Sequence, residues 1–142
     1  MSTRLKEKGE KILKVLEALT EESAKGIPIV VEGKKDVAAL RALGVTGTVL
    51  TVKTGGKSFL EFVSEIEKMN VPEVILFLDF DRRGKEGTKH LKQSLERIKI
   101  KPNVKLWRSF SALVGKEIQC IESLTAYLHT LHEKLSPQYN PH

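Results

Sequence analysis

The sequence predicts an α/β protein built on a four-stranded, mainly parallel sheet with helices on both faces and a further helix at each end. Three observations support this fold class. Short apolar runs alternate four times with segments of helical periodicity, which is the pattern of strand–helix–strand crossovers. The run Val74–Leu78 is apolar at every position, as a central parallel strand requires. The 142 residues, 40% of them hydrophobic, are enough for one domain with a real core.

The first half of the chain is expected to contain two of these strands. Apolar residues at helical spacing, with charges between them, predict an amphipathic helix over residues 3–20. The apolar run Pro28–Val31 predicts a short buried strand. A helix ended by Gly44 separates it from the second strand, residues 48–52.

The middle of the chain contains the strongest strand signal. Gly55 and Gly56 open a helix whose apolar residues share one face over residues 59–69. The strand Val74–Leu78 then leads through Asp79-Phe80-Asp81 into a basic helix that continues to Ile98. We therefore expect a strand-to-helix junction with two aspartates at its centre.

The last part of the chain is expected to be mainly helical. Val104–Trp107 is interpreted as a fourth, edge-like strand, and a short helix begins at Ser109 or Ser111. Leucines at helical spacing predict a final helix over residues 124–135, and the patternless tail that follows is expected to be disordered. The expected organisation is an N-terminal helix at 1–25, the α/β domain at 26–108, a helical extension at 109–135 and the tail at 136–142.

Composition excludes several classes of protein. A single cysteine, Cys120, excludes an intramolecular disulfide framework and any zinc site built from several cysteines. The longest apolar run has five residues, far fewer than a membrane span needs. The first ten residues are charged throughout and contain no apolar segment typical of a secretory signal. We therefore expect a cytoplasmic protein that does not bind membranes.

The positive charge is concentrated in one stretch of the sequence. The net charge is +6, from 24 Lys and Arg against 18 Asp and Glu. Between Arg82 and Arg108, ten cations are opposed by only two acids, a local charge of +8, whereas the rest of the chain carries −2. A basic stretch on a slightly acidic body suggests a polyanion partner, most often nucleic acid, and a solvated lysine-rich helix face is an equally weighted alternative.

Three carboxylates are expected at one edge of the sheet. In doubly wound sheets, sites form outside the carboxyl ends of the strands, where the strand order reverses. Glu32 follows the first strand, and Asp79 and Asp81 follow the third, where strand alternation would point both to the same side. If these strands are neighbours, the three acids face one another. Clustered carboxylates suit a hard cation such as Mg²⁺, and helix capping is the alternative role for such acids.

Two motifs resemble the signatures of the Toprim domain, which has a Rossmann-like fold. Val30–Asp36 reads Val-Val-Glu-Gly-Lys-Lys-Asp, and Phe77–Gly84 reads Phe-Leu-Asp-Phe-Asp-Arg-Arg-Gly. In that family an apolar strand ends in Glu-Gly, and a later strand ends in Asp-x-Asp followed by Gly. The resemblance covers residues 28–107 and is greatest to small stand-alone Toprim proteins and the ribosomal-RNA maturase ribonuclease. Primases, topoisomerases, OLD-family nucleases and recombination mediators share the domain.

The resemblance implies a role for each motif residue. Glu32 would be the general acid/base of a catalytic site, and Asp79 and Asp81 would bind Mg²⁺, or Mn²⁺ in its place. Three further residues would support the site. Gly33 and Gly84 would allow tight turns and close backbone approach, and Asp36 would support the site from one helical turn further on.

The chain departs from the larger Toprim enzymes. No tyrosine lies where a topoisomerase needs its nucleophile, because Tyr127 and Tyr139 lie in the last helix and the tail, and no Cys/His zinc module accompanies the domain. The resemblance therefore favours a Mg²⁺-dependent endonuclease that hydrolyses phosphodiester bonds in structured RNA or DNA, with RNA favoured. The alternatives are a non-catalytic nucleic-acid-binding module and a subunit of a larger replication, repair or RNA-processing complex.

Partner contacts are expected from the basic residues and from the terminal helices. Lys57 precedes a helix whose N-terminus could bind phosphate, although the segment before it lacks the first glycine of a P-loop. The leucine stripes of the terminal helices could cover the sheet, dock a second copy of the chain or dock another protein. The candidate nucleic-acid-binding residues are Lys34, Lys57, Arg82, Arg83, Lys85 and Lys89.

Overall fold

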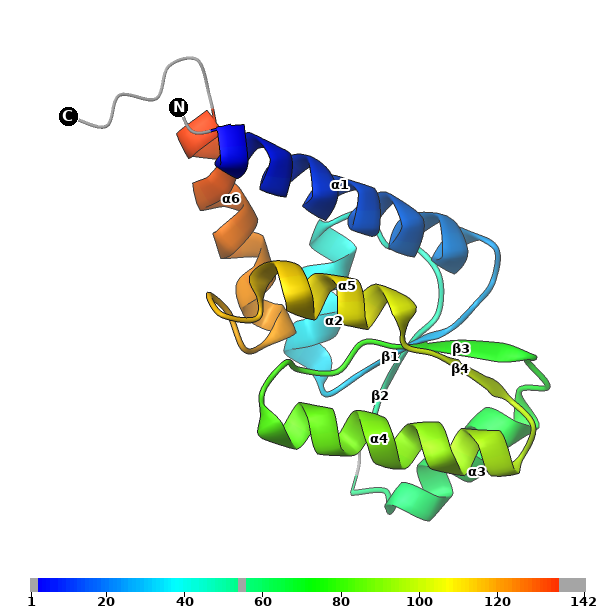
Figure 1. Ribbon diagram of the computed structural model, residues 1–142. Helices are drawn as coiled ribbons and strands as arrows, with labels where there is room; N and C mark the ends of the chain where they lie inside the picture. The colour runs from blue at the N-terminus through cyan, green and yellow to red at the C-terminus, as the bar shows by residue number, and fades with distance from the viewer. Residues whose placement is uncertain (1–2, 54–55, 136–142) are drawn as a thin grey trace.

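The computed structural model describes residues 3–53 and 56–135, which form a four-stranded sheet between two layers of helices (Figure 1). Every strand pair in this sheet is parallel, which confirms the predicted fold class. The strand order is β2-β1-β3-β4, with bounds β1 (Ile29–Val31), β2 (Val49–Thr51), β3 (Glu73–Leu76) and β4 (Lys101–Asn103). The helices are α1 (Thr3–Ala24), α2 (Lys34–Ala42), α3 (Phe59–Lys68), α4 (Arg82–Arg97), α5 (Lys105–Val114), the 3-10 helix η1 (Ile121–Ser123) and α6 (Leu124–Leu135).

The period of two along each strand divides the core into two layers. On β1, Ile29 and Val31 pack into one hydrophobic cluster and Val30 packs into the other. Helices α1, α2, α5 and α6 cover the first face of the sheet, and α3 and α4 cover the second (Figure 1). The chain runs outward from β1 to β2 and then back across to β3, so the strand order reverses between β1 and β3. The edge beyond these two strands is where a site is expected.

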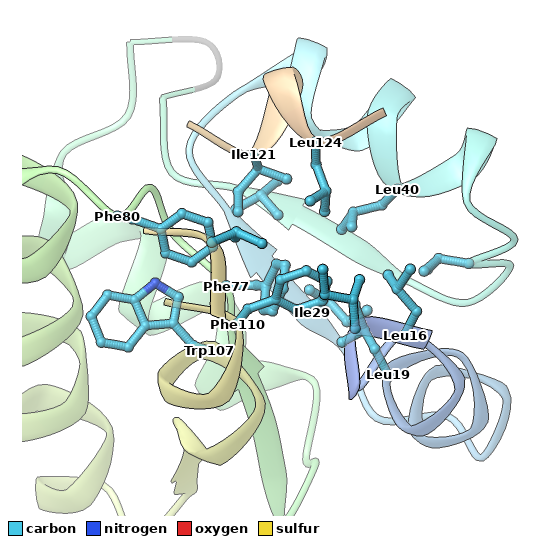
Figure 2. Close-up of a cluster of buried hydrophobic side chains, with 14 of the residues drawn as sticks. Leu16, Leu19, Ile29, Leu40, Phe77, Phe80, Trp107, Phe110, Ile121 and Leu124 are labelled. Carbon is cyan, nitrogen blue, oxygen red and sulfur yellow. The ribbon is translucent and has the colours of Figure 1, made fainter. Parts of the chain in front are cut away.

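The larger cluster joins the two ends of the chain to the sheet. Figure 2 shows Leu16 and Leu19 of α1 near Ile29 of β1, with Phe77 and Phe110 at the centre. The rings of Phe77 and Phe110 meet edge to face, with centroids 5.5 Å apart. The buried leucines of α1 and α6 therefore pack in the core of their own chain.

One predicted strand is wrong. Residues Val104–Trp107 were expected to be the edge strand, whereas β4 ends at Asn103 and α5 begins at Lys105. Trp107, Phe110 and Val114 are buried and follow one another at helical spacing. Pro102 masks the true strand in the sequence, because proline disfavours central strands but is tolerated at an edge. As a result, α5 begins earlier than the expected start at Ser109 or Ser111 and runs through the expected domain boundary at residue 108.

Other element boundaries differ by a few residues. The N-terminal helix continues to Ala24 rather than residue 20. The third helix begins at Phe59, after Ser58 accepts a hydrogen bond from the backbone N–H of Glu61, and not at the glycine pair. Gly55 and the tail 136–142, for which disorder was expected, lie outside the described residues. Within the described ranges, no helix is long and apolar enough to cross a membrane.

Substitutions in α1 test whether its apolar stripe stabilises the fold. Leu19 is fully buried, whereas Leu13 is 58% exposed on the same helix. Leu19→Ala is expected to lower the free energy of unfolding by about 2–5 kcal/mol, because it leaves a cavity in the core. Leu13→Ala, the matched control, is expected to change it by less than about 0.5 kcal/mol. Urea denaturation measures both values, and equal small effects would show that α1 does not belong to the stabilising core.

Candidate functional site

Four carboxylates lie near one another where the strand order reverses. Glu32 directly follows β1, and Asp79 lies three residues beyond the end of β3. These strands are neighbours, with Val30 paired to Leu76, so the expected adjacency of the first and third strands is present. The charges of Asp36, Glu32 and Asp81 all raise the pKa of Asp79, which shows that the four groups lie within electrostatic range.

Asp79 is the most strongly perturbed acid of this group. Its pKa is raised to about 6, first by burial away from water and then by the charges of the neighbouring acids. A hydrogen bond from the backbone N–H of Ile121 to its Oδ1, at 3.1 Å, opposes this shift. Asp79 is therefore half-buried, held by one oxygen, and costly to ionise without a nearby cation.

The loop that carries Asp79 is held by the C-terminal part of the chain. The indole N–H of Trp107 donates to the carbonyl oxygen of Leu78 at 2.7 Å. The backbone N–H of Phe80 donates to the carbonyl oxygen of Gln119 at 2.6 Å. Figure 2 shows Phe80 beside Trp107 and close to Ile121. Gln119 and Ile121 lie in the expected helical extension and Trp107 in the expected edge strand. The sequence predicted none of them at the site, because nothing in their local pattern indicates a contact so far along the chain.

Asp81 is oriented by the helix that follows it rather than by a strand. The strand ends at Leu76, so the alternation used to align Asp79 and Asp81 does not apply to them. Asp81 is the N-cap of α4, and its Oδ1 accepts a hydrogen bond from the backbone N–H of Gly84 at 2.8 Å. Asp81 thus has a capping role, the alternative considered for these acids, as well as its place beside Asp79.

Asp36, the last residue of the first motif, is buried. Its Oδ2 accepts a hydrogen bond from the backbone N–H of Gly33 at 2.9 Å, and it also accepts one from the backbone of Glu122. Burial raises its pKa, and the charges of Glu122 and Glu32 add to the shift. Because Glu122 follows Ile121, consecutive amides at the start of η1 hold Asp36 and Asp79. The 3-10 helix therefore fixes two of the four acids.

Glu32 lies at the solvent side of the group. Its side chain is 16% exposed, and its Oε2 lies 3.1 Å from Nζ of Lys53. The backbone N–H of Lys53 also donates to the carbonyl oxygen of Glu32 at 3.0 Å. Sequence reasoning missed Lys53, although its place directly after the second strand, at the same sheet edge, was a usable signal.

The two motif glycines differ in their surroundings. A Cβ on Gly84 would lie 2.0 Å from the carbonyl oxygen of Asp79, so only glycine allows α4 to pack against that loop. A Cβ on Gly33 would meet nothing within 4 Å, and its backbone is extended. Close approach between parts of the chain therefore explains Gly84 and not Gly33.

The candidate cations fall into two groups. Arg82 pairs with Glu86 at 3.1 Å, and Lys57 pairs with Glu65 at 2.7 Å, so both have intramolecular partners. The second group is exposed and has no ion-pair partner among the described residues: Lys34, Arg83, Lys85 and Lys89. Lys34, Arg83 and Lys85 lie in the first turns of α2 and α4, directly beyond the acids.

The donor set fits a magnesium ion that is completed by water and substrate. Asp79 and Asp81 each use one carboxylate oxygen for a backbone N–H, and the second oxygen of each has no hydrogen bond from a described residue. Among the described residues, no three acid, histidine or cysteine side chains are gathered tightly enough to hold a metal on their own. Mg²⁺ typically takes one or two carboxylates and fills its other positions with water and phosphate oxygens.

Comparisons with known proteins agree with the resemblance of the two motifs to the Toprim domain. The family model of the Toprim domain matches residues 26–108. The chain is 38% identical to the UPF0292 protein MJ1624 of Methanocaldococcus jannaschii, over 84% of this chain and 91% of that protein. It is 32% identical to a UPF0292 protein of Methanosarcina acetivorans, over 92% and 89%. A putative protein from Aquifex aeolicus has a similar fold, with a TM-score of 0.64 at 24% identity, over 78% of this chain and 94% of that one.

The raised pKa of Asp79 makes stability depend on pH in a defined direction. The pKa of the Asp79 carboxyl is about 6 in the folded chain, against an ordinary value of 3.8, so this group favours folding when it is protonated. Its contribution is therefore present below about pH 4 and is lost as the pH rises to about 6. Asp79→Asn, which keeps an oxygen for the N–H of Ile121, should stabilise the protein at pH 7 and not at pH 4. Melting curves of both proteins in EDTA measure this, and a pH-independent difference would contradict it.

Gly84 and Gly33 offer a matched pair of substitutions. Gly84→Ala should lower the free energy of unfolding by about 1–3 kcal/mol, because the new methyl group would overlap the backbone of Asp79. The opposite sign would be expected from helix propensity alone, since alanine favours helices over glycine. Gly33→Ala should cost about 1 kcal/mol or less. Chemical denaturation compares them, and a stabilised Gly84→Ala protein would show that the close contact is absent.

Proposed function

Because the chain belongs to the Toprim domain family, we propose that it hydrolyses phosphodiester bonds in structured RNA or DNA as a Mg²⁺-dependent endonuclease, with RNA as the favoured substrate. The observation that carries this proposal is the group of four acids at the strand-order reversal, with Asp79 costly to ionise unless a cation is near. Exposed cations begin directly beyond these acids, at the first turn of α4. The proposed metal site and the proposed phosphate-binding residues thus lie at the same strand-to-helix junction.

Asp79 and Asp81 are the residues that would hold the metal. In each aspartate, one carboxylate oxygen accepts a hydrogen bond from a backbone N–H. This bond fixes the carboxylate and leaves its other oxygen available to the metal. When bound, Mg²⁺ would neutralise the charge that develops on the scissile phosphate. Asp36 is buried and is held by the backbone of both Gly33 and Glu122. It would therefore fix the first turn of α2 relative to the loop that carries Asp79.

Glu32 would act as the general acid/base of the reaction. Its carboxylate is partly exposed, so water and a substrate can reach it, and Lys53 limits its orientations. In this position it would take a proton from the attacking water or supply one to the leaving oxygen. Arg83, Lys85 and Lys34 would contact phosphates on either side of the bond that breaks.

A specific observation favours one alternative, a non-catalytic nucleic-acid-binding module. Asp81 caps α4, and Asp36 binds the backbone of Gly33 and Glu122, so both acids stabilise the fold without any metal. Under this alternative, the aspartates are structural and the basic surface alone binds nucleic acid. Binding would then depend on salt but would lead to no cleavage.

Cleavage assays with a matched variant pair separate the two functions. Wild type, Glu32→Gln and Glu67→Gln are incubated with structured RNAs and DNAs in Mg²⁺ or in EDTA. Glu67 is an exposed glutamate of α3 and controls for the loss of one charge. We expect Glu32→Gln to cleave about 100-fold more slowly or worse, Glu67→Gln to match wild type, and EDTA to abolish cleavage.

Two outcomes would contradict the catalytic proposal. One is equal cleavage by wild type and Glu32→Gln, which would point to a contaminating nuclease. The other is the absence of cleavage by all three proteins together with salt-sensitive binding, which would support the binding module.

A further inference from the structure

A basic hollow lies beside the edge strand, in a part of the surface that the proposed mechanism does not use. It measures about 550 Å³ and is lined by residues of three elements. Figure 1 shows β4 between α4 and the start of α5, and residues of these three elements line the hollow. We call it the β4 hollow, and its cations are Lys92 of α4, Lys101 of β4, and Lys105 and Arg108 of α5.

The four cations of the β4 hollow have no opposing charge bound to them. Within the described residues, no ion pair or hydrogen bond involves the side chain of any of the four. Glu73, which pairs in register with Lys101 across the sheet, instead accepts a hydrogen bond from Nδ2 of Asn103 at 2.8 Å. Glu96, one turn beyond Lys92, is exposed and forms no ion pair with it. The hollow therefore keeps a concentrated positive charge.

Protection of the sheet edge does not account for this charge. Lysine on an edge strand discourages pairing with another chain, and that would explain Lys101. Lys92, Lys105 and Arg108 lie on helices, where they protect no strand edge. Like charges gathered around a concave surface raise the local potential, which favours an anionic ligand.

The first turn of α5 adds to the preference for an anion. Its N-cap, Val104, supplies no side-chain hydrogen bond to the first-turn amides. Asn103 Oδ1 accepts a hydrogen bond from the N–H of Lys105 at 3.1 Å. The remaining first-turn amides and the helix dipole favour negative charge at the same place as the cations.

One side of α4 connects the acidic group to the β4 hollow. Lys85, Lys89 and Lys92 follow one another at four and three residues, so they lie on one side of the helix. Each of these lysines comes directly after a buried residue of α4. They therefore lie beside the buried stripe, which consists of Gly84, Thr88, Leu91 and Leu95. From Asp81 to Lys92 the helix rises about 16 Å, a distance that a nucleic-acid strand spans with several nucleotides.

We propose that the β4 hollow binds the phosphodiester backbone of the same nucleic-acid strand whose scissile bond lies at Asp79, several nucleotides away along α4. The proposal rests on the proposed function, because it takes nucleic acid as the ligand of the chain. It adds a second, remote phosphate site formed by Lys92, Lys101, Lys105 and Arg108. The β4 hollow would thereby make binding depend on the length of the strand and fix its direction over the acids.

Salt-dependent binding with two charge-matched triple variants tests this proposal. The first variant is Lys101→Ala/Lys105→Ala/Arg108→Ala, which keeps the partly buried Lys92. The control is Lys11→Ala/Lys14→Ala/Lys116→Ala, which removes three exposed cations that lie on α1 and in the turn after α5. Anisotropy of labelled 20-nucleotide RNA and DNA strands, in EDTA to prevent cleavage, gives the affinity between 50 and 300 mM salt. Circular dichroism checks that both variants are folded.

The hollow variant should lose about two units from the slope of log affinity against log salt, since each phosphate contact on a single strand contributes about 0.7. At 0.1 M salt this corresponds to an affinity about 100-fold lower, whereas the control should stay within about threefold of wild type. Equal losses in both variants, or none in either, would overturn the remote site. If Lys85→Ala/Lys89→Ala reduces binding and the hollow variant does not, the proposed function survives and the β4 hollow does not bind the strand. If wild type binds neither RNA nor DNA, both fail.

Discussion

The loop that carries Asp79 depends on hydrogen bonds with residues that lie much later in the chain, at a separation of 29 to 42 positions. After β3 ends at Leu76, the backbone of the loop has no sheet partner along most of its length, and buried peptide groups need one. Trp107 and Gln119 supply such partners through an indole N–H and a carbonyl oxygen, and the backbone N–H of Ile121 binds the carboxylate of Asp79. The helical extension is therefore part of the site, and its packing in the larger core cluster determines where Asp79 lies.

Two opposite charge densities meet at the start of α4. Up to Asp81, the four acids share one edge of the sheet. Among the described residues, only Lys53 forms an ion pair with any of them. Beyond Asp81, the helix carries exposed cations along its length. Each density alone is unfavourable, because like charges repel. A phosphate backbone with a bound divalent cation would compensate both at once.

The capping contacts have a second consequence for the site. Asp81 holds the first turn of α4, and Asp36 holds the first turn of α2, so carboxylates of the acidic group also fix the helices around the candidate site. Ile121 and Glu122, at the start of η1, join the two motifs through consecutive amides. Preorganisation of this kind reduces the cost of ordering the site when a substrate arrives.

The sequence by itself determined the layers and the sheet edge at which the candidate site lies. Alternation along Pro28–Val31 and Val74–Leu78 is a local property, because each residue faces one of two helix layers. Strand–helix alternation then placed Glu32 and Asp79 at the same edge. Contacts across many residues were decided only by the tertiary structure, since no local pattern records them: the loop partners around Trp107, the pairing of Lys53 with Glu32, and the β4 hollow. The mistaken strand at Val104–Trp107 has the same cause, because burial against the sheet, rather than local alternation, made that segment a helix.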